Sequence, residues 1–328
     1  MSQIAARALE LLGKCDYFCI KFSGNDIVIM DNDRLVVIVG PTGVGKTAAA
    51  IEVAKVLNTE IISADSRQIF REIPIGTAAP TAEEQAAVRH HFVAIKSIAE
   101  YYSAAQFESD ALTLLPQLFA KSGYAVMCGG SMLYVDAVCK GIDLMPTISA
   151  EVREKVISQY RECGIECIIA QLELLDPDYL AIVDVKNEKR LLHALEICLQ
   201  ARVPYSSLRT GKVKQRPFKM VKIGLNMPRE ELFDRINRRV DAMIEAGLEA
   251  EARRVYPMRH LNSLNTVGFK EMFAYFDGTM DFVTARERIK KNTRVYAKRQ
   301  LTWFAKDKDI VWMRPEEAAE AVEKMTRG

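Results

Sequence analysis

Residues 35–39 (LVVIV) form an uninterrupted run of β-branched and aliphatic side chains. A run without polar alternation is typical of a strand buried on both faces of a parallel sheet. It ends in a glycine-rich turn, after which residues 47–57 have helical periodicity. Strand-like segments recur at residues 60–63, 124–128 and 219–225. Strands that alternate with helices predict an α/β protein with a doubly wound parallel sheet.

A different pattern occupies residues 144–205. Helical segments rich in Glu, Leu and Ile are broken there at Gly164, Pro177 and Pro204, residue types that commonly end or interrupt helices. We interpret this stretch as a mostly α-helical insertion domain. After residue 225, most of the chain has the pattern of long amphipathic helices with Arg and Lys on the polar side.

These patterns divide the chain into three parts. Residues 35–143 and 206–328 form the predicted catalytic core, and residues 144–205 form the helical insertion. Residues 1–34 form an N-terminal extension with an ambiguous pattern. Within it, residues 5–12 are compatible with a short helix and residues 27–30 with a short strand.

The composition indicates a folded protein rather than a fibrous, disordered or membrane-spanning one. The 328 residues are 49% hydrophobic and 27% charged, which allows a sizeable core. No apolar run reaches the roughly 18 to 20 residues that span a bilayer, and the N-terminus lacks the pattern of a secretory signal. The seven cysteines are scattered and do not form a dense disulfide framework. We therefore expect a cytoplasmic protein with reduced cysteines.

Two cysteine pairs have a spacing that could contribute to a metal site. They are Cys15 with Cys19 and Cys163 with Cys167. No set of Cys and His residues completes four ligands around either pair. We therefore do not expect a cysteine-bound metal.

The net charge of +2 conceals an asymmetry along the chain. Residues 1–200 contain 18 Lys and Arg against 26 Asp and Glu, whereas residues 201–328 contain 27 against 17. The balance is therefore −8 in the first part and +10 in the second. A basic part indicates a polyanionic partner such as nucleic acid or a phosphorylated ligand, although a solvated basic face is the alternative.

The turn after the first strand contains a phosphate-binding motif. It matches G-x-x-x-x-G-K-[ST] between a predicted strand and a predicted helix, and consists of Gly40, Pro41, Thr42, Gly43, Val44, Gly45, Lys46 and Thr47. Its glycines let N–H groups point at one anion, and the helix N-terminus adds partial positive charge. We predict that Lys46 neutralises phosphate oxygens and that the Thr47 hydroxyl holds Mg²⁺. The default ligand of such a loop is a nucleoside triphosphate such as ATP.

Two further segments follow predicted strands at what would be the same edge of the sheet. Asp65 comes after residues 60–63, where a carboxylate faces the ligand crevice of an α/β sheet. It could act there as a base or support Mg²⁺, and capping of a helix is the structural alternative. Gly129, Gly130 and Ser131 place a glycine pair and a hydroxyl after residues 124–128. Three segments at one edge predict a ligand site there.

The motifs together resemble those of the tRNA dimethylallyltransferase family, also called tRNA isopentenyltransferases or the IPP transferase family. The resemblance extends from Leu35 to about Trp312. Besides the phosphate loop it rests on these blocks: Ser63-Ala64-Asp65-Ser66-x-Gln68, Ile75-Gly76-Thr77-Ala78-x-Pro80, His90-His91-Phe92, Tyr102-Ser103-x-x-x-Phe107, Gly129-Gly130-Ser131-x-Leu133-Tyr134, Glu188-x-Arg190-x-x-x-Ala194-Leu195-Glu196, Arg235-Ile236-x-x-Arg239-Val240-x-x-Met243, Gly247-Leu248-x-x-Glu251, Thr266-Val267-Gly268-Phe269-Lys270-Glu271 and Thr293-Arg294-x-Tyr296-Ala297-Lys298-Arg299-Gln300-x-Thr302-Trp303-Phe304.

The resemblance implies a P-loop NTPase-like core and a prenyltransferase. Such an enzyme transfers a dimethylallyl group from dimethylallyl diphosphate to N6 of the adenosine at position 37 of tRNA, 3′ to the anticodon. The phosphate loop would then hold the departing diphosphate without hydrolysing an NTP, and Lys46 and Mg²⁺ on Thr47 would stabilise its charge. By resemblance Asp65 is the base that takes the N6 proton. Ser131 keeps the hydroxyl of the family's Gly-Gly-Thr.

The resemblance also implies an arginine that clamps the diphosphate. Arg235 and Arg239 lie four residues apart and would share one face of a helix. Bidentate guanidinium geometry suits a diphosphate. The alternative is surface ion pairing with Asp234 or Asp241, and the sequence does not rank the two arginines.

The tRNA contacts implied by the resemblance fall on several segments. Some would hold the flipped-out adenine, some lie in the helical insertion that embraces the anticodon stem-loop, and others are basic. Residues 286–299 contain seven Lys or Arg and one acidic residue, and such groups position RNA through its phosphates. The predicted tRNA-binding residues are Asp65, Ser66, Arg67, Gln68, Ser131, Arg153, Lys189, Arg190, Leu191, Leu192, His193, Gly268, Phe269, Lys270, Arg294, Lys298 and Arg299.

Two other patterns favour structural roles. Phe269, Phe273 and Phe276 recur at helical spacing, which favours core packing over base stacking. His90 and His91 are interpreted as packing or hydrogen-bonding residues rather than metal ligands.

Three other functions remain open at this point. One is a prenyltransferase acting on a free adenine nucleotide, although a small acceptor would need neither a basic C-terminal part nor a helical insertion. The others are a P-loop kinase that uses ATP and an RNA-binding module with a vestigial loop. Residues 1–34 have no counterpart in the usual bacterial form of the family, and the zinc finger of eukaryotic relatives is absent. The expected oligomeric state is a monomer.

Overall fold

The computed structural model describes residues 33–327. The helix predicted at 5–12, the strand predicted at 27–30, and Cys15 and Cys19 lie outside the described residues. The strands are β1 (Arg34–Val39), β2 (Ile61–Ser63), β3 (His90–His91), β4 (Tyr124–Gly129), β5 (Lys219–Leu225) and β6 (Val311–Met313). The helices are α2 (Lys46–Val56), α3 (Pro74–Thr77), α4 (Ala82–Ala87), α5 (Ala104–Ser122), α6 (Met132–Lys140), α7 (Ala150–Leu175), α8 (Pro177–Ile182), α9 (Glu188–Ala201), α10 (Tyr205–Leu208), α11 (Arg229–Glu245), α12 (Leu248–Val255), α13 (Phe269–Phe276), α14 (Phe282–Phe304) and α15 (Ala318–Arg327).

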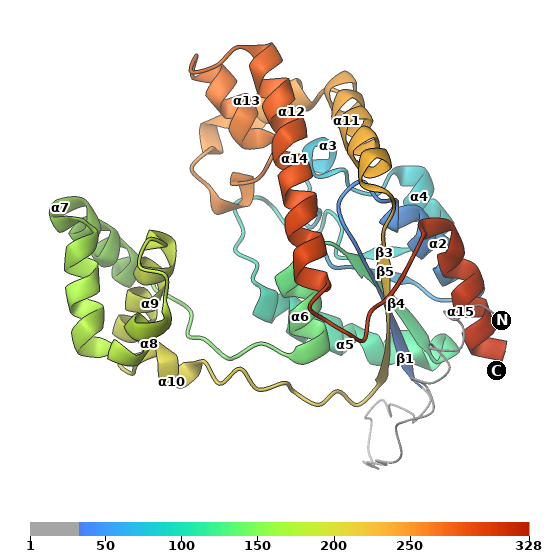
Figure 1. Ribbon diagram of the computed structural model, residues 1–328, viewed down its shortest axis with the longest axis horizontal. Coiled ribbons are helices and arrows are strands. Elements are labelled where there is room, and N and C mark those ends of the chain that lie inside the picture. The colour runs from blue at the N-terminus through green and yellow to red at the C-terminus, as the bar shows by residue number, and fades with distance from the viewer. Residues whose placement is uncertain (1–32, 328) are drawn as a thin grey trace. The chain divides into compact units, whose positions relative to one another are not determined.

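The strands form one six-stranded sheet in the order β3-β2-β4-β1-β5-β6, in which every neighbouring pair is parallel. Figure 1 labels β1, β3, β4 and β5 of this sheet. The predicted P-loop NTPase-like α/β core is therefore confirmed. The four strands predicted within residues 33–327 are all present. The sequence did not predict β3 and β6, which are short strands of two and three residues at the two edges of the sheet.

Helices cover both faces of this sheet. On one face, α2 and α15 pack in the same core cluster as Val36 and Ile38 of β1. On the other face, α5 and α6 pack with Leu35, Val37 and Val39. Successive side chains of a strand point to opposite faces, so an uninterrupted apolar run is what a two-sided core requires. No helix within residues 33–327 is both long and apolar enough to cross a membrane.

The loops after β2 and β4 approach each other very closely. A Cβ atom on Gly129 would lie 2.1 Å from the carbonyl oxygen of Ala64, so the last residue of β4 has to be glycine. The backbone N–H of Ala64 donates to the carbonyl of Cys128 at 2.8 Å, and the N–H of Ser131 donates to the carbonyl of Ala64 at 3.2 Å. These bonds hold the two loops together at the carboxyl edge of the sheet.

Residues Lys140–Gln215 form a separate compact unit. Helices α7 to α10 surround its core, which contains Val156, Ile168, Leu172, Tyr179, Leu191, Ala194, Leu195 and Cys198. The backbone is not helical at Gly164, and Pro177 opens α8. The unit is longer at both ends than the predicted range 144–205, because its flanking segments pair: the N–H of Lys214 donates to the carbonyl of Lys140 at 2.7 Å.

Arg216 anchors the chain where it enters the core again before β5. Its guanidinium lies 2.7 Å from the carboxylate of Glu108 on α5, and both side chains are buried, with 6% and 8% exposed. The same guanidinium donates to the carbonyls of Ala137 and Val138 at the end of α6. One side chain thus fixes the start of the β5 segment against two helices.

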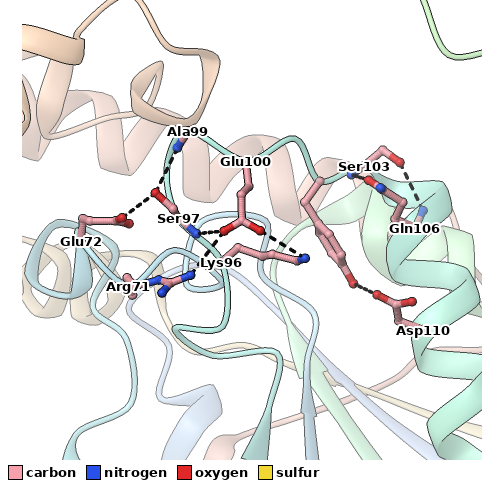
Figure 2. A network of polar contacts seen from close by, with 10 residues as sticks. Arg71, Glu72, Lys96, Ser97, Ala99, Glu100, Ser103, Gln106 and Asp110 are labelled. Carbon is pink, nitrogen blue, oxygen red and sulfur yellow. Dashed lines mark hydrogen bonds and ion pairs between the residues drawn. The ribbon is translucent and has the colours of Figure 1, made fainter.

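A polar network holds the connection between β3 and α5 (Figure 2). Glu100 accepts a hydrogen bond from the backbone N–H of Ser97 at 2.6 Å, and the Ser97 hydroxyl donates to Glu72 at 2.7 Å. The hydroxyl of Ser263 donates to the carbonyl of Ile98 in this connection at 2.7 Å. Ile98 is itself held by Glu72, to which its N–H donates at 3.0 Å, so the network also positions Ser263, which precedes the loop leading to α13.

The Arg216 anchor can be tested by chemical unfolding. Arg216→Met should lower the free energy of unfolding by about 3–5 kcal/mol, because Glu108 would lose the buried cation that faces it. Urea unfolding followed by circular dichroism measures this change. The control Lys55→Met breaks an exposed pair with Glu52 and should cost less than about 1 kcal/mol. A loss as small as the control's would contradict the assignment.

Candidate active site

The loops after β1, β2 and β4 open into one cavity of about 540 Å³ at the carboxyl edge of the sheet. This is where ligands bind in open α/β sheets. Helices α11 and α14 and the loop before α13 complete the wall. The lining residues that bear on the chemistry are Thr42, Gly43, Gly45, Lys46, Asp65, Ser66, Arg67, Gln68, Cys128, Gly129, Gly130, Ser131, Arg235, Arg239, Gly268, Lys270, Tyr296 and Gln300.

The phosphate loop has the conformation that its glycines allow. Gly43 and Gly45 have φ values of 84° and 101°, a region that other residues rarely adopt. The α2 helix begins directly after them at Lys46, so the first-turn N–H groups of that helix have no intrahelical partner. Together with the helix dipole they favour an anion at this end of the cavity.

The other residues of the motif shape the loop rather than line the cavity. A Cβ atom on Gly40 would lie 2.6 Å from the carbonyl oxygen of Leu225. Val44 is fully buried, and its N–H donates to the carbonyl of Pro41 at 3.3 Å. Thr47 is half-buried in the first turn of α2.

Lys46 points its ammonium group at the loop itself. Its Nζ donates to the carbonyls of Gly40 at 3.1 Å and Pro41 at 2.9 Å. The pKa of Lys46 is lowered to about 8, mainly by burial and also by the cation of Arg239, whereas Cys128 and Asp65 oppose the shift. An anion in the cavity would stabilise the ammonium form, so anion binding and protonation of Lys46 favour each other.

Asp65 is held by the backbone of its own loop. Its Oδ1 accepts hydrogen bonds from the N–H groups of Arg67 at 2.9 Å and Gln68 at 3.3 Å. Within residues 33–327 no group donates to its other carboxylate oxygen, Oδ2. The carboxylate therefore has a fixed orientation and one oxygen that can accept a proton. The predicted alternative, a helix cap, is not what this local turn shows, because no helix begins after Asp65 until α3 at Pro74.

Ser131 connects the loop after β4 to the loop that carries Asp65. Its Oγ accepts a hydrogen bond from the N–H of Ser66 at 2.8 Å, and it donates to the Ser66 hydroxyl at 3.2 Å. Tyr296 on α14 lies beside this pair. Burial and the carboxylate of Asp65 raise the Tyr296 pKa to about 12, although Arg67 and a hydrogen bond with Ser131 partly offset the rise.

Arg235 and Arg239 both line the cavity, at different depths. Arg235 is exposed, and its Nε donates to the carbonyl of Gly43 at 3.1 Å. Arg239 is half-buried near Asp65; burial lowers its pKa, and Asp65 opposes that shift. Asp241 pairs instead with Arg286 and Lys290, and neither Arg235 nor Arg239 forms an ion pair in the described part of the chain. The alternative of surface pairing is therefore wrong.

The structure divides the predicted tRNA-binding residues of the core into two groups. Ser66, Arg67, Gln68, Ser131, Gly268 and Lys270 line the cavity. The Gln68 amide is committed to protein partners, since it accepts from the Ser63 hydroxyl at 3.1 Å and donates to the Ala78 carbonyl at 3.0 Å. Lys298 and Arg299 are exposed on α14, outside the cavity. Arg294, also outside, donates to Asn237 at 2.5 Å.

Two predicted RNA contacts are corrected by burial. Phe269 is fully buried in a core cluster with Phe273, which confirms the packing interpretation of the phenylalanine stripe. Leu191 is also fully buried, in the core of the unit formed by residues 140–215. Neither side chain can touch RNA, because each is enclosed by its own hydrophobic cluster. In the same unit Arg153, Lys189, Arg190 and His193 are exposed and Leu192 is half-buried.

The two histidines form hydrogen bonds, as predicted. His91 Nε2 lies 2.6 Å from a carboxylate oxygen of Glu60, and His90 Nδ1 lies 2.8 Å from the carbonyl of Val88. No group of three His, Cys, Asp or Glu that could hold a metal ion is present between residues 33 and 327.

Sequence reasoning gave no individual role to Tyr296 or Gln300. Both line the cavity, and Thr293 does so too. The three residues lie at positions i, i+3 and i+7 of α14, which places them on one helix face. Their helical spacing was the sequence signal for a shared face, but the segment was interpreted through its Lys and Arg residues instead.

Comparison with known proteins gives consistent results. A family model described as IPP transferase matches residues 68–307. A protein of Phocaeicola vulgatus named tRNA dimethylallyltransferase 1 is 52% identical over 291 residues, which cover 89% of this chain and 97% of the relative. A protein of Porphyromonas gingivalis W83 with the same name is 55% identical over 282 residues, covering 86% and 94%.

Solved structures are similar as well. A tRNA isopentenylpyrophosphate transferase from Bacillus halodurans has a TM-score of 0.66 and 36% identity, covering 90% of this chain and 96% of that chain. A eukaryotic dimethylallyltransferase acting on tRNA has a TM-score of 0.70 and 25% identity, covering 83% and 70%.

The Lys46 pKa predicts how anion binding depends on pH. The Lys46 ammonium is present below pH 8 and is lost as the pH rises through its pKa of about 8. Affinity for inorganic diphosphate, measured by calorimetry, should therefore weaken about tenfold per pH unit above pH 8 relative to the Lys46→Arg variant. The arginine introduced at position 46 stays protonated over this range, so any pH dependence of its affinity comes from protonation of diphosphate and of other groups. A constant affinity ratio between pH 7 and 9.5 would exclude Lys46 from the anion site.

Proposed function

The chain belongs to the IPP transferase family, and on that premise we propose that it is a tRNA dimethylallyltransferase. It transfers a dimethylallyl group from dimethylallyl diphosphate to N6 of adenosine 37 of tRNA and releases diphosphate. The observation that carries this proposal is the shared cavity, in which an anion-binding loop and an oriented carboxylate face the same space. A transfer from a diphosphate to a weak nitrogen nucleophile needs both groups.

The diphosphate end of the cavity is formed by the phosphate loop and Lys46. Arg239 of α11 lines the same cavity as Lys46, and its cation lowers the Lys46 pKa. Arg235 is exposed, and its Nε donates to the carbonyl of Gly43. Cations and N–H groups placed before the reaction stabilise the charge that develops on the leaving group. We assign Arg239 to the diphosphate and Arg235 to closing the loop.

Asp65 is the base of the proposed reaction. The bond between C1 of the dimethylallyl group and the diphosphate oxygen breaks, and its electron pair leaves with the diphosphate. N6 of adenine forms the new bond to C1, and its proton passes to the carboxylate. The two N–H groups on Oδ1 fix the carboxylate, so Oδ2 can receive this proton.

Mg²⁺ is the proposed metal, held through oxygen ligands. Thr47 is the second residue of α2, directly after Lys46, and its hydroxyl is a hard ligand of the kind Mg²⁺ prefers. Because residues 33–327 offer no cluster of three acidic or His and Cys ligands, the diphosphate and water would supply most of the remaining oxygens. When bound, Mg²⁺ neutralises charge on the diphosphate.

The acceptor is proposed to be a tRNA anticodon stem-loop. Relatives that are 52% and 55% identical are named tRNA dimethylallyltransferases. Lys298 and Arg299 on α14 and Lys189 and Arg190 on α9 are exposed cations that suit RNA phosphates. The adenine would have to leave its stack to reach the enclosed carboxylate. We further propose that the enzyme acts as a monomer in the cytoplasm.

One assay separates this proposal from its rivals. Dimethylallyl diphosphate with a radiolabelled prenyl group is incubated with the protein and either tRNA or AMP, and label is counted in each acceptor. We expect label in tRNA only. Label in AMP would indicate an adenine-nucleotide prenyltransferase, and phosphate transfer from ATP without any prenyl transfer would indicate a kinase.

The role of Asp65 predicts a specific loss of turnover. Asp65→Asn keeps the Oδ1 acceptor for the loop N–H groups but cannot take a proton, so kcat should fall by about 10²–10⁴-fold. Binding of tRNA, measured by filter retention, should stay close to that of the unmodified protein. The control Asp110→Asn changes an exposed carboxylate that accepts from Tyr102 and should leave kcat unchanged. Full turnover in Asp65→Asn would remove Asp65 as the base.

The exposed cations on α14 predict the salt dependence of tRNA binding. Replacing Lys298 and Arg299 together by alanine should weaken affinity and reduce the slope of log K against log salt by about one for each lost phosphate contact. The control Lys324→Ala removes an exposed cation of α15 that is paired with Glu320. An unaltered slope in the double variant would place the RNA elsewhere on the protein.

A further inference from the structure

Gln300 is almost completely buried, with 2% of its surface exposed, yet it carries two polar atoms into the wall of the active-site cavity. We propose that Gln300 is a positioning residue that holds the diphosphate site and the Asp65 site in register. The inference rests on the proposed function.

The Gln300 amide makes one hydrogen bond to each of two neighbouring loops. Its Oε1 accepts from the N–H of Thr42 in the phosphate loop at 2.8 Å. Its Nε2 donates to the carbonyl of Gly130 in the loop after β4, also at 2.8 Å. Strands β1 and β4 are paired directly, so the amide bridges the ends of adjacent strands. A buried amide in this position satisfies both backbone groups, which would otherwise be costly to enclose.

The glycine at position 130 is explained by this bridge. A Cβ atom there would lie 2.2 Å from Nε2 of Gln300 and 3.5 Å from the ammonium of Lys46. Any larger residue would push the amide away from the loop. The second glycine of the Gly-Gly-Ser segment therefore makes room for Gln300, whereas the first makes room for the Ala64 carbonyl.

The bridge continues towards the base. Gly130 is followed by Ser131, whose Oγ accepts from the N–H of Ser66 at 2.8 Å, and Ser66 follows Asp65 in the chain. Thr42 of the phosphate loop is thus connected to Ser66, the neighbour of Asp65, through Gln300, the Gly130-Ser131 segment and three hydrogen bonds. Because a misplacement of about 1 Å can cost on the order of 100-fold in rate, losing the bridge should affect turnover more than binding.

The bridge also decides how the phosphate loop uses its N–H groups. The Thr42 N–H is committed to Gln300, and the Val44 N–H donates to the Pro41 carbonyl. Pro41 has no N–H group. Anion binding is therefore left to the N–H groups of Gly43, Gly45 and the first turn of α2. Without Gln300, the Thr42 N–H would be free to turn towards the ligand and change the position of the diphosphate.

Two substitutions test the bridge. Gln300→Met keeps the volume of the side chain but removes both hydrogen bonds. We expect kcat for prenyl transfer to fall by about 100-fold, while the KM for dimethylallyl diphosphate changes by less than about threefold and the unfolding midpoint remains well above the assay temperature. A purely structural role would lower stability and leave kcat of the folded protein unchanged.

Gln300→Glu gives a signature in the pH profile. The ionised carboxylate can accept from the Thr42 N–H but repels the Gly130 carbonyl, whereas the protonated acid restores both bonds. Because position 300 is buried, the pKa of a carboxyl there is raised. The ratio of its kcat to that of the unmodified protein should therefore be well below one at pH 9 and rise about tenfold or more as the carboxyl is protonated at lower pH. The other titratable groups that line the cavity are Lys46, Asp65, Arg67, His90, Cys128, Arg235, Arg239, Lys270 and Tyr296. They are present in both proteins, and the protein with glutamine at position 300 is the reference for their titration.

The control for this change is Gln106→Glu, at an exposed capping position of α5 outside the cavity. Its activity ratio should stay near one at every pH. A kcat for Gln300→Met within about threefold of the unmodified protein, or a kcat ratio near one at every pH for Gln300→Glu, would overturn the inference. If Gln300→Met does not fold, the isosteric Gln300→Glu ratio alone decides the question. Failure of the unmodified protein to label tRNA would instead refute the proposed function.

Discussion

The parallel direction of the strands is the constraint on which the site depends. Because β1, β2 and β4 run the same way, their carboxyl ends emerge at one edge, and the loops that follow have to share the same space. That space concentrates a lysine ammonium, an arginine and a carboxylate in a partly desolvated cavity. Desolvation is unfavourable for each charge alone, and the lowered pKa of Lys46 records that cost. Lys46, Arg235 and Arg239 outnumber the Asp65 carboxylate in this cavity, so an anionic ligand would offset their excess positive charge.

The second half of the chain completes what the sheet begins. Helix α11 supplies Arg235 and Arg239, and α14 supplies Tyr296 and Gln300. Gln300 and Thr42 are 258 residues apart in sequence, yet they share a hydrogen bond. The basic part of the chain is thus not only a surface for a polyanion, since some of its cations line the cavity and others, such as Lys290 with Asp241, are committed to structure.

Local structure followed the sequence patterns, whereas the predicted RNA contacts at Leu191 and Phe269 were wrong because both side chains are buried. A phosphate loop is defined by consecutive residues between a strand and a helix, so it was recognised with its conformation. Leu191 and Phe269 stand inside recognisable motifs, but neighbours from other parts of the chain enclose them. A motif carries both contact residues and the residues that support them, and periodicity alone does not separate the two.

By itself the sequence determined the alternation of strands and helices, the glycine-rich loop between β1 and α2, the helical segments of residues 144–205 and the family, because each of these depends on contiguous residues or on motifs of fixed spacing. Tertiary structure alone decided that Arg239 lies deeper than Arg235, that Gln68 is occupied by its own protein, and that Gln300 joins two loops. The physical reason is that burial and hydrogen-bond partners are set by distances between segments far apart in the chain, and no local pattern contains those distances.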